Sequence, residues 1–232
     1  SGYFTFPSNL ISRFFFAPYF GLRIQKILFD YDFRGEIFPN KEFNNFKSSL
    51  GKTIGPNEPH EFWYFWKRFM KFKNFQKFSK SEINKINWLL ICKELAAFES
   101  IENKPLLFKG MHFNWNLIDV LNKLPNVKFI YIKRNPIDNG ISLYNSRIKY
   151  FGDPNEFYSF KPFEFKKIKF KEPEEEIIRQ VLFTNNTIQK HLSLIDPRHY
   201  ITIDYEEFCL SQENFKNKFY KKFGILLKLE QT

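Results

Sequence analysis

The chain has 232 residues, a formal net charge of +11, and 43% hydrophobic residues that include 32 phenylalanines. This apolar content can bury a core and argues against a disordered chain. The positive charge suits an anionic partner such as a nucleotide, but the basic and aromatic residues form no nucleic-acid-binding motif, so we expect no nucleic-acid partner.

No apolar run approaches the roughly 20 residues that a membrane span requires, so no span is expected. Cys92 and Cys209 are too few for a disulfide framework. Both lie in apolar stretches, which predicts two buried thiols. We therefore expect a protein of the reducing cytoplasm.

The first expected elements are a strand at residues 3–6 and a helix from Leu10 onward, joined only by Pro7, Ser8 and Asn9. At such a turn, backbone N–H groups and a helix N-terminus can hold a phosphate. Ser8 and Asn9 are therefore candidate binding residues. The alternative is that they only cap the helix.

A rigid, charged turn follows, in which Glu58, His60 and Glu61 lie close to two prolines and an aromatic helix start. Loops held by rigid flanks often carry function. The two glutamates are therefore candidate functional residues. The alternative is that they stabilise the helix through its N-terminal dipole.

A β-α-β unit is expected over residues 106–132, with apolar strands at residues 105–108 and 127–132. Lys109 and His112 follow the first strand. Ligands of open α/β sheets bind at this carboxyl edge. The alternatives are a surface lysine and a loop histidine packed beside aromatic residues.

Arg134 follows the second strand, which ends at Asn135-Pro136 because proline has no N–H. The sequence predicts a helix next, with Asp138 as its N-cap and Ser142 in its first turns. A guanidinium and a hydroxyl that converge at a sheet edge suit a phosphate group. The alternative is an ordinary strand-to-helix turn.

The rest of the chain predicts an irregular segment at residues 150–172, a helix at 173–191, a strand at 200–205 and a terminal helix at 215–224. The last strand ends in Tyr205-Glu206-Glu207-Phe208.

The segment from the strand through Arg134 and Asn-Pro to Ser142, eight residues after the arginine, resembles the 3′-phosphate-binding segment of sulfotransferases that use 3′-phosphoadenosine 5′-phosphosulfate (PAPS). Lys109 with His112 resembles a second element of that family, and residues 205–208 resemble a third. The resemblance covers most of the chain. It is weakest at residues 7–9, where the basic residue and glycine of the family's 5′-phosphosulfate loop are absent. Either this loop is degenerate, or a few residues are missing between Phe6 and Ser8, which intact mass would reveal.

The resemblance implies one domain over residues 1–232 with a P-loop-like α/β architecture. In this fold a central, mostly parallel sheet of four or five strands is flanked by helices. It also implies transfer of a sulfuryl group from PAPS to a hydroxyl or amine acceptor, such as a glycan or small molecule, with 3′-phosphoadenosine 5′-phosphate (PAP) as product. No metal is implied.

The roles implied by the resemblance fall into three groups. Arg134 and Ser142 bind the 3′-phosphate, and Ser8 and Asn9 belong to the 5′ loop. Lys109 stabilises the leaving phosphate, and residues 150–172 form a variable lid or acceptor wall. The base that takes the acceptor's proton is one of three residues: His112, Glu58 or Glu61.

Two other functions stay open. One is a nucleotide-dependent kinase of the P-loop class, although the Gly-rich motif that such a kinase needs after the first strand is absent. The other is a non-catalytic protein that binds a nucleotide or glycan and has a degenerate 5′ loop.

Overall fold

The computed structural model describes residues 2–32, 34–36, 48–72 and 77–227. The chain divides into two compact units, which are described separately. The first comprises Ser1–Lys71 and Asn84–Gly110, and the second comprises Phe72–Ile83 and Met111–Thr232.

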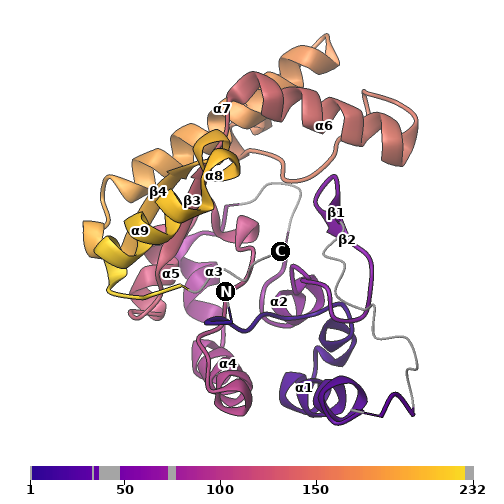
Figure 1. Cartoon of the computed structure of the whole chain (residues 1–232). Coiled ribbons are helices and arrows are strands. Elements are labelled where there is room, and N and C mark those ends of the chain that lie inside the picture. The colour runs from indigo at the N-terminus through magenta and orange to yellow at the C-terminus, as the bar shows by residue number, and fades with distance from the viewer. Residues whose placement is uncertain (1, 33, 37–47, 73–76, 228–232) are drawn as a thin grey trace. The chain divides into compact units, whose positions relative to one another are not determined.

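The first unit is mainly helical (Figure 1). Its elements in chain order are the 3-10 turn η1 (Ile11–Phe14), α1 (Pro18–Gln25), the π-helical turn η2 (Lys26–Asp30), β1 (Ser48–Ser49), β2 (Lys52–Thr53), α2 (Trp63–Phe69) and α4 (Trp88–Glu102). Helix α3 (Lys80–Lys85) lies where the chain passes from the second unit into the first.

The core of the first unit is built from aromatic and aliphatic side chains of α2 and α4, such as Phe65, Trp66, Ile91 and Phe98, each at most 1% exposed. An ion pair adds to it: Arg68 of α2 donates to both carboxylate oxygens of Glu94 in α4, at 2.7 and 2.8 Å. This two-point geometry fixes orientation as well as distance, because the guanidinium and the carboxylate are both planar.

The strands expected at residues 3–6 and 105–108 form a single parallel bridge, between Thr5 and Leu106. The Thr5 N–H donates to the Pro105 carbonyl at 3.0 Å, and the Leu107 N–H donates to the Thr5 carbonyl at 2.8 Å. The expected pairing direction is therefore present, but over fewer residues than the apolar run suggests. Pro105 contributes no N–H to the pairing with residues 3–6. On the opposite edge, the Leu106 N–H bonds to the Glu99 side chain and not to another strand.

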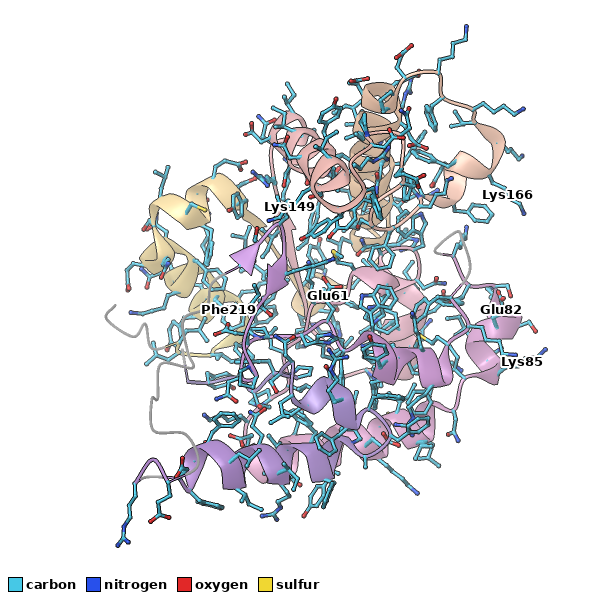
Figure 2. All side chains as sticks on the ribbon, turned by 90° about the vertical axis from the view of Figure 1, so that its right-hand side faces the viewer. Glu61, Glu82, Lys85, Lys149, Lys166 and Phe219 are labelled. Carbon is cyan, nitrogen blue, oxygen red and sulfur yellow. The ribbon has the colours of Figure 1, made fainter. Side chains whose placement is uncertain are left out.

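The second unit contains a two-stranded parallel sheet, in which β3 (Phe129–Lys133) pairs with β4 (Tyr200–Asp204) in register from Phe129–Tyr200 to Lys133–Asp204 (Figure 1). Its helices are α5 (Leu117–Lys123), α6 (Pro136–Phe151), α7 (Pro173–Leu192), α8 (Tyr205–Leu210) and α9 (Gln212–Phe223), with 3-10 turns η3 (Met111–Phe113), η4 (Phe163–Lys167) and η5 (Pro197–His199). In α9, Phe219 is 3% exposed and anchors the helix (Figure 2).

Parallel pairing brings the carboxyl ends of β3 and β4 to the same edge. Arg134 follows the last residue of β3, and Tyr205 follows the last residue of β4. Since Lys133 pairs with Asp204, these next residues are neighbours across the sheet edge. The register therefore places residues 71 positions apart at one site.

Helices α6 and α7 pack against each other (Figure 1). An ion pair between Arg147 and Glu176 joins them. Arg147 of α6 is fully buried and donates to Glu176 Oε2 of α7 at 2.7 Å and to the Pro154 carbonyl at 3.0 Å. A buried guanidinium needs such partners, because removing one of them leaves an uncompensated charge. The pair therefore fixes how the segment after α6 folds back onto α7.

Two expectations about single residues are wrong. Asp138 does not cap α6: Asn135 is the N-cap, its side-chain oxygen accepts the Ile137 N–H at 2.9 Å, and Pro136 occupies the first helical position. Proline suits that position because its missing N–H would have no helical partner there. Cys209 is exposed, because the short helix α8 buries none of its residues, whereas Cys92 is half-buried.

The fold is thus a mixture of helices and strands with a small parallel sheet. Among the described residues, no helix is both long and apolar enough to cross a membrane.

Candidate functional site

The junction of β3 with α6, residues 133–142, is the candidate phosphate-binding segment. The Arg134 guanidinium lies over the ring of Tyr205, 4.9 Å from its centroid. Within the described part of the chain it forms no ion pair and no hydrogen bond, so its five N–H donors are available to a ligand. The Tyr205 ring contacts one face of the guanidinium, and the N–H groups at the edge of the guanidinium, which bind anions, remain accessible.

The backbone of this segment is held by the neighbouring helix α8. Glu206 Oε1 accepts the Asn135 N–H at 2.9 Å. This hydrogen bond, with smaller contributions from the nearby Arg134 and Lys133, holds the pKa of the Glu206 carboxyl below its usual value. A charged carboxylate at this position therefore fastens the start of α6 beside Arg134.

Ser142 lies in α6, half-buried, one helical turn after Asp138 on the same face. Its carbonyl accepts a hydrogen bond from the Ser146 hydroxyl at 2.8 Å. No hydrogen bond ties its own hydroxyl to another described residue. The segment thus presents one guanidinium and one hydroxyl that the fold itself does not use.

Lys109 and Glu61, two predicted catalytic residues, form an ion pair in the first unit, with Lys109 Nζ 2.7 Å from Glu61 Oε1. The Trp63 indole N–H donates to the other carboxylate oxygen, Oε2, also at 2.7 Å. Glu61, labelled in Figure 2, therefore has a partner on each oxygen. The lysine side chain is 48% exposed, so its ammonium is accessible.

His112 lies in η3 of the second unit and is only 1% exposed. The rings of Phe72 and Phe113 contact it, with centroids 5.9 and 4.1 Å away. Burial lowers the pKa of His112 to about 3, because the charged imidazolium would lose its hydration. The imidazole is therefore neutral at pH 7, the protonation state that a base requires, but it lies inside the unit.

Ser8 and Asn9, with Leu10 and Pro7, form the N-terminal junction, which is clamped by residues 55–60. The Asn9 and Leu10 N–H groups donate to the carbonyls of Glu58 and Pro56 at 2.9 Å each, and the His60 N–H donates to the Pro7 carbonyl at 2.7 Å. These bonds use N–H groups that a phosphate-binding loop would offer to its ligand.

The side chains of the N-terminal junction are also used within the fold. The Ser8 hydroxyl is fully buried, donates to Gln25 Oε1 and accepts the Ile11 N–H at 3.1 Å. The Asn9 amide donates to the Gly55 carbonyl at 2.8 Å and to Thr53 Oγ1 at 3.2 Å. These two side chains do not fit a 5′-phosphosulfate group in this conformation, since their donors already have partners.

Glu58, the remaining candidate base, is 1% exposed. Its backbone carbonyl is the acceptor for Asn9, so the residue connects the rigid turn to the N-terminal junction. No cluster of His, Cys, Asp and Glu that could hold a metal ion is formed by the described residues.

The structure therefore brings seven of the eight predicted residues together in three groups, which do not include His112. Lys109 meets Glu61, and Ser8 and Asn9 meet the segment of Glu58. Arg134 and Ser142 share one strand-to-helix segment. Sequence reasoning missed the supports Trp63, Tyr205 and Glu206. Part of the signal for the last two was present, because residues 205–208 resemble an element of the family, but only the pairing of β3 with β4 places them beside Arg134.

A family model described as a sulfotransferase domain matches residues 63–221, which is more than half of the chain. The chain therefore belongs to the sulfotransferase domain family. The match includes Lys109, His112, Arg134 and Ser142 and begins after Ser8, Asn9, Glu58 and Glu61. Searches of curated proteins and of solved structures find no match.

Proposed function

We propose that this protein is a PAPS-dependent sulfotransferase that acts on a hydroxyl or amine acceptor. The observation that carries the proposal is the segment of residues 133–142. There Arg134 is stacked and oriented, but its hydrogen-bonding edge is unused by the described residues, and Ser142 follows on α6. A dianionic phosphate complements this pair of donors, whereas an uncharged ligand would leave the arginine charge without a partner.

The chemistry of sulfuryl transfer assigns roles to the remaining candidate residues. When PAPS is bound, the acceptor oxygen or nitrogen forms a bond to sulfur, the bond from sulfur to the 5′-phosphate oxygen breaks, and the acceptor proton leaves. Lys109 stabilises the negative charge that grows on the phosphate oxygen, since its ammonium is accessible. A base of the chain, His112 or Glu58 or Glu61, takes the proton.

We also propose the complete fold that the sequence predicts. Residues 1–232 then form one P-loop-like domain with a central sheet of four or five strands. The parallel pairing of Thr5 with Leu106 and that of β3 with β4 support it, since both pairings have the direction that this architecture requires. The exposed thiol of Cys209 and the half-buried thiol of Cys92 are compatible with the proposed cytoplasmic location.

The proposed acceptor wall, residues 150–172, forms most of a cavity of about 350 Å³ at the start of α7. Its lining combines the aromatic residues Phe165 and Phe170 with three lysines: Lys161, Lys169 and Lys171. This lining supports a role of the segment in holding part of an acceptor.

The test is a calorimetric titration with PAP, with 5′-AMP as the control. We expect PAP to bind and 5′-AMP to bind much more weakly, because only PAP has a 3′-phosphate. Turnover of PAPS is then followed by PAP release with a panel of hydroxyl and amine acceptors. Equal affinity for the two nucleotides would contradict the 3′-phosphate site.

A second function, a non-catalytic nucleotide- or glycan-binding protein, is favoured by one observation. The Ser8 and Asn9 donors are used within the fold, as expected of a degenerate 5′ loop. This protein would bind PAP with the same preference over 5′-AMP but release no PAP from PAPS with any acceptor.

A further inference from the structure

We propose that Glu61 is a positioning residue that holds Lys109 and is not the base, and that the Trp63 indole fixes the Glu61 carboxylate. This inference rests on the proposed function, because it gives Lys109 its role in sulfuryl transfer. It reduces the candidate bases to His112 and Glu58.

The contacts of the carboxylate carry the argument. Glu61 Oε1 lies 2.7 Å from the Lys109 ammonium, and Oε2 accepts the Trp63 indole N–H at 2.7 Å. Each oxygen therefore already has a short contact with a donor. Each oxygen keeps a second lone pair, but a proton taken up by Glu61 would neutralise the carboxylate that pairs with the Lys109 ammonium. Glu61 would then stop holding the cation at the moment when the leaving phosphate needs it.

The backbone between Glu61 and Trp63 is shaped for this contact. Phe62 has a left-handed conformation with φ of 57°, and its side chain is 1% exposed. Its N–H donates to His60 Nδ1 at 2.9 Å. A bulky residue in this region costs about 1–3 kcal/mol and persists only where its surroundings determine the conformation. Here the conformation lets two side chains that are two positions apart meet.

The lysine end of the contact is also confined. A Cβ added to Gly51, in the turn between β1 and β2, would lie 3.5 Å from Lys109 Nζ, so the ammonium lies between this turn and Glu61. A lysine side chain otherwise has about 2 kcal/mol of rotamer entropy, part of which this confinement removes before a ligand binds. The ammonium has three N–H donors, so the contact with Glu61 leaves others for a phosphate oxygen.

The kinetic test compares Glu61→Gln and Trp63→Phe with the wild type. We expect Glu61→Gln to lower kcat for PAP release from PAPS by about 10- to 100-fold, because a misplaced catalytic group costs up to about that factor. The affinity for PAP and the acid limb of the pH profile of kcat/KM stay unchanged. Trp63→Phe lowers kcat less, and the double variant is no slower than Glu61→Gln alone, because both changes disturb one contact.

The matched control is Trp88→Phe, which removes an indole N–H at the start of α4, outside the residues proposed for the site. We expect this variant to keep the kcat of the wild type. A Glu61→Gln enzyme that loses the acid limb would identify Glu61 as the base and overturn the proposal. Wild-type kcat in Glu61→Gln would overturn it as well.

A second measurement does not depend on turnover. The indole N–H resonances of ¹⁵N-labelled protein are recorded and assigned for wild type, Glu61→Gln and Lys109→Met. We expect the Trp63 resonance to move in both variants and the Trp115 resonance to stay. An unmoved Trp63 resonance rejects the contact itself. The Trp63 resonance could also move in a protein that neither binds PAP nor releases PAP from PAPS. In that case the contact is confirmed, but the proposed function and this role of Glu61 are rejected.

Discussion

The candidate phosphate-binding segment at residues 133–142 and the N-terminal junction at residues 7–10 are both predicted strand-to-helix turns, but they use their polar groups differently. In the first, Arg134 is supported on one face by Tyr205, and neither its hydrogen-bonding edge nor the Ser142 hydroxyl bonds to a described residue. In the second, Ser8 and Asn9 donate to Gln25, Thr53 and Gly55.

The difference teaches how a binding turn is told from a structural one. In the proposed binding turn, the backbone is held by a group other than the proposed ligand donors, since Glu206 accepts the Asn135 N–H. A structural turn satisfies the same atoms internally, because buried donors without partners are costly. Substitutions in the two turns should therefore affect different quantities: ligand affinity in the first and stability in the second.

The largest expected effect is that of Arg134→Ala. We expect PAP affinity to fall about 100-fold, since a hydrogen-bonded charge contributes about 1.5–3 kcal/mol. The melting temperature should stay close to that of the wild type, because the guanidinium forms no described hydrogen bond or ion pair within the fold. Calorimetry with PAP measures the affinity, and Arg198→Ala, which removes an exposed arginine, is the control. Unchanged PAP binding in Arg134→Ala would refute the central assignment.

The loss of stability at acid pH tests whether the His112 side chain is buried away from solvent, as the Ser8 hydroxyl is. Its pKa is about 3 in the folded state against 6.5 without burial, so below pH 6.5 the unfolded chain binds a proton that the folded chain does not. The contribution to stability is thus present above pH 6.5 and is lost as the pH falls toward 3, by up to about 1.4 kcal/mol per pH unit.

Urea unfolding between pH 7 and 4.5 measures this dependence. We expect His112→Gln to flatten the loss of stability with falling pH, whereas His199→Gln, the control for removing a histidine, keeps the wild-type slope. Equal slopes in His112→Gln and the wild type would show that His112 is hydrated in the folded protein.

A pair of serine substitutions sharpens the comparison directly. Ser8→Ala should lower the free energy of unfolding by about 1–3 kcal/mol, because it removes the hydrogen-bond partner of the half-buried Gln25 side chain and of the buried Ile11 N–H. Ser142→Ala should leave stability unchanged and weaken PAP binding by about 1 kcal/mol, or roughly fivefold. Denaturant unfolding and PAP titration of both variants check this. A loss of PAP affinity in Ser8→Ala without a loss of stability would reverse the assignment of the N-terminal junction.

The smallest expected effect is that of Tyr205→Leu. It removes the ring below the Arg134 guanidinium, a contact typically contributing about 0.5–1 kcal/mol at an exposed site. We expect PAP affinity to fall two- to fivefold, with kcat less affected. Tyr220→Leu, in the exposed face of α9, is the matched control. PAP affinity equal to the wild type would mean that the stacking does not orient the arginine.

The sequence alone determined the sulfotransferase family, the strand that ends before Arg134, and the helix that contains Ser142. These follow from local signals: an apolar strand-forming run, a proline that ends it, and an arginine and a serine at a fixed spacing along one chain segment. The family match over residues 63–221 confirms the family. The same local reasoning misassigned the cap of α6, because Asn135 and Asp138 are both good capping residues and only the backbone conformation distinguishes them.

Only the tertiary structure decided which polar groups meet. The parallel register of β3 and β4 placed Tyr205 and Glu206 beside Arg134, and the left-handed Phe62 turned Trp63 toward Glu61. Burial separated His112 from solvent and gave the Ser8 hydroxyl its partners within the fold. The physical reason is that a residue's type and spacing fix what it can donate or accept, whereas its partners are fixed by non-local packing and register, to which chain positions far apart contribute.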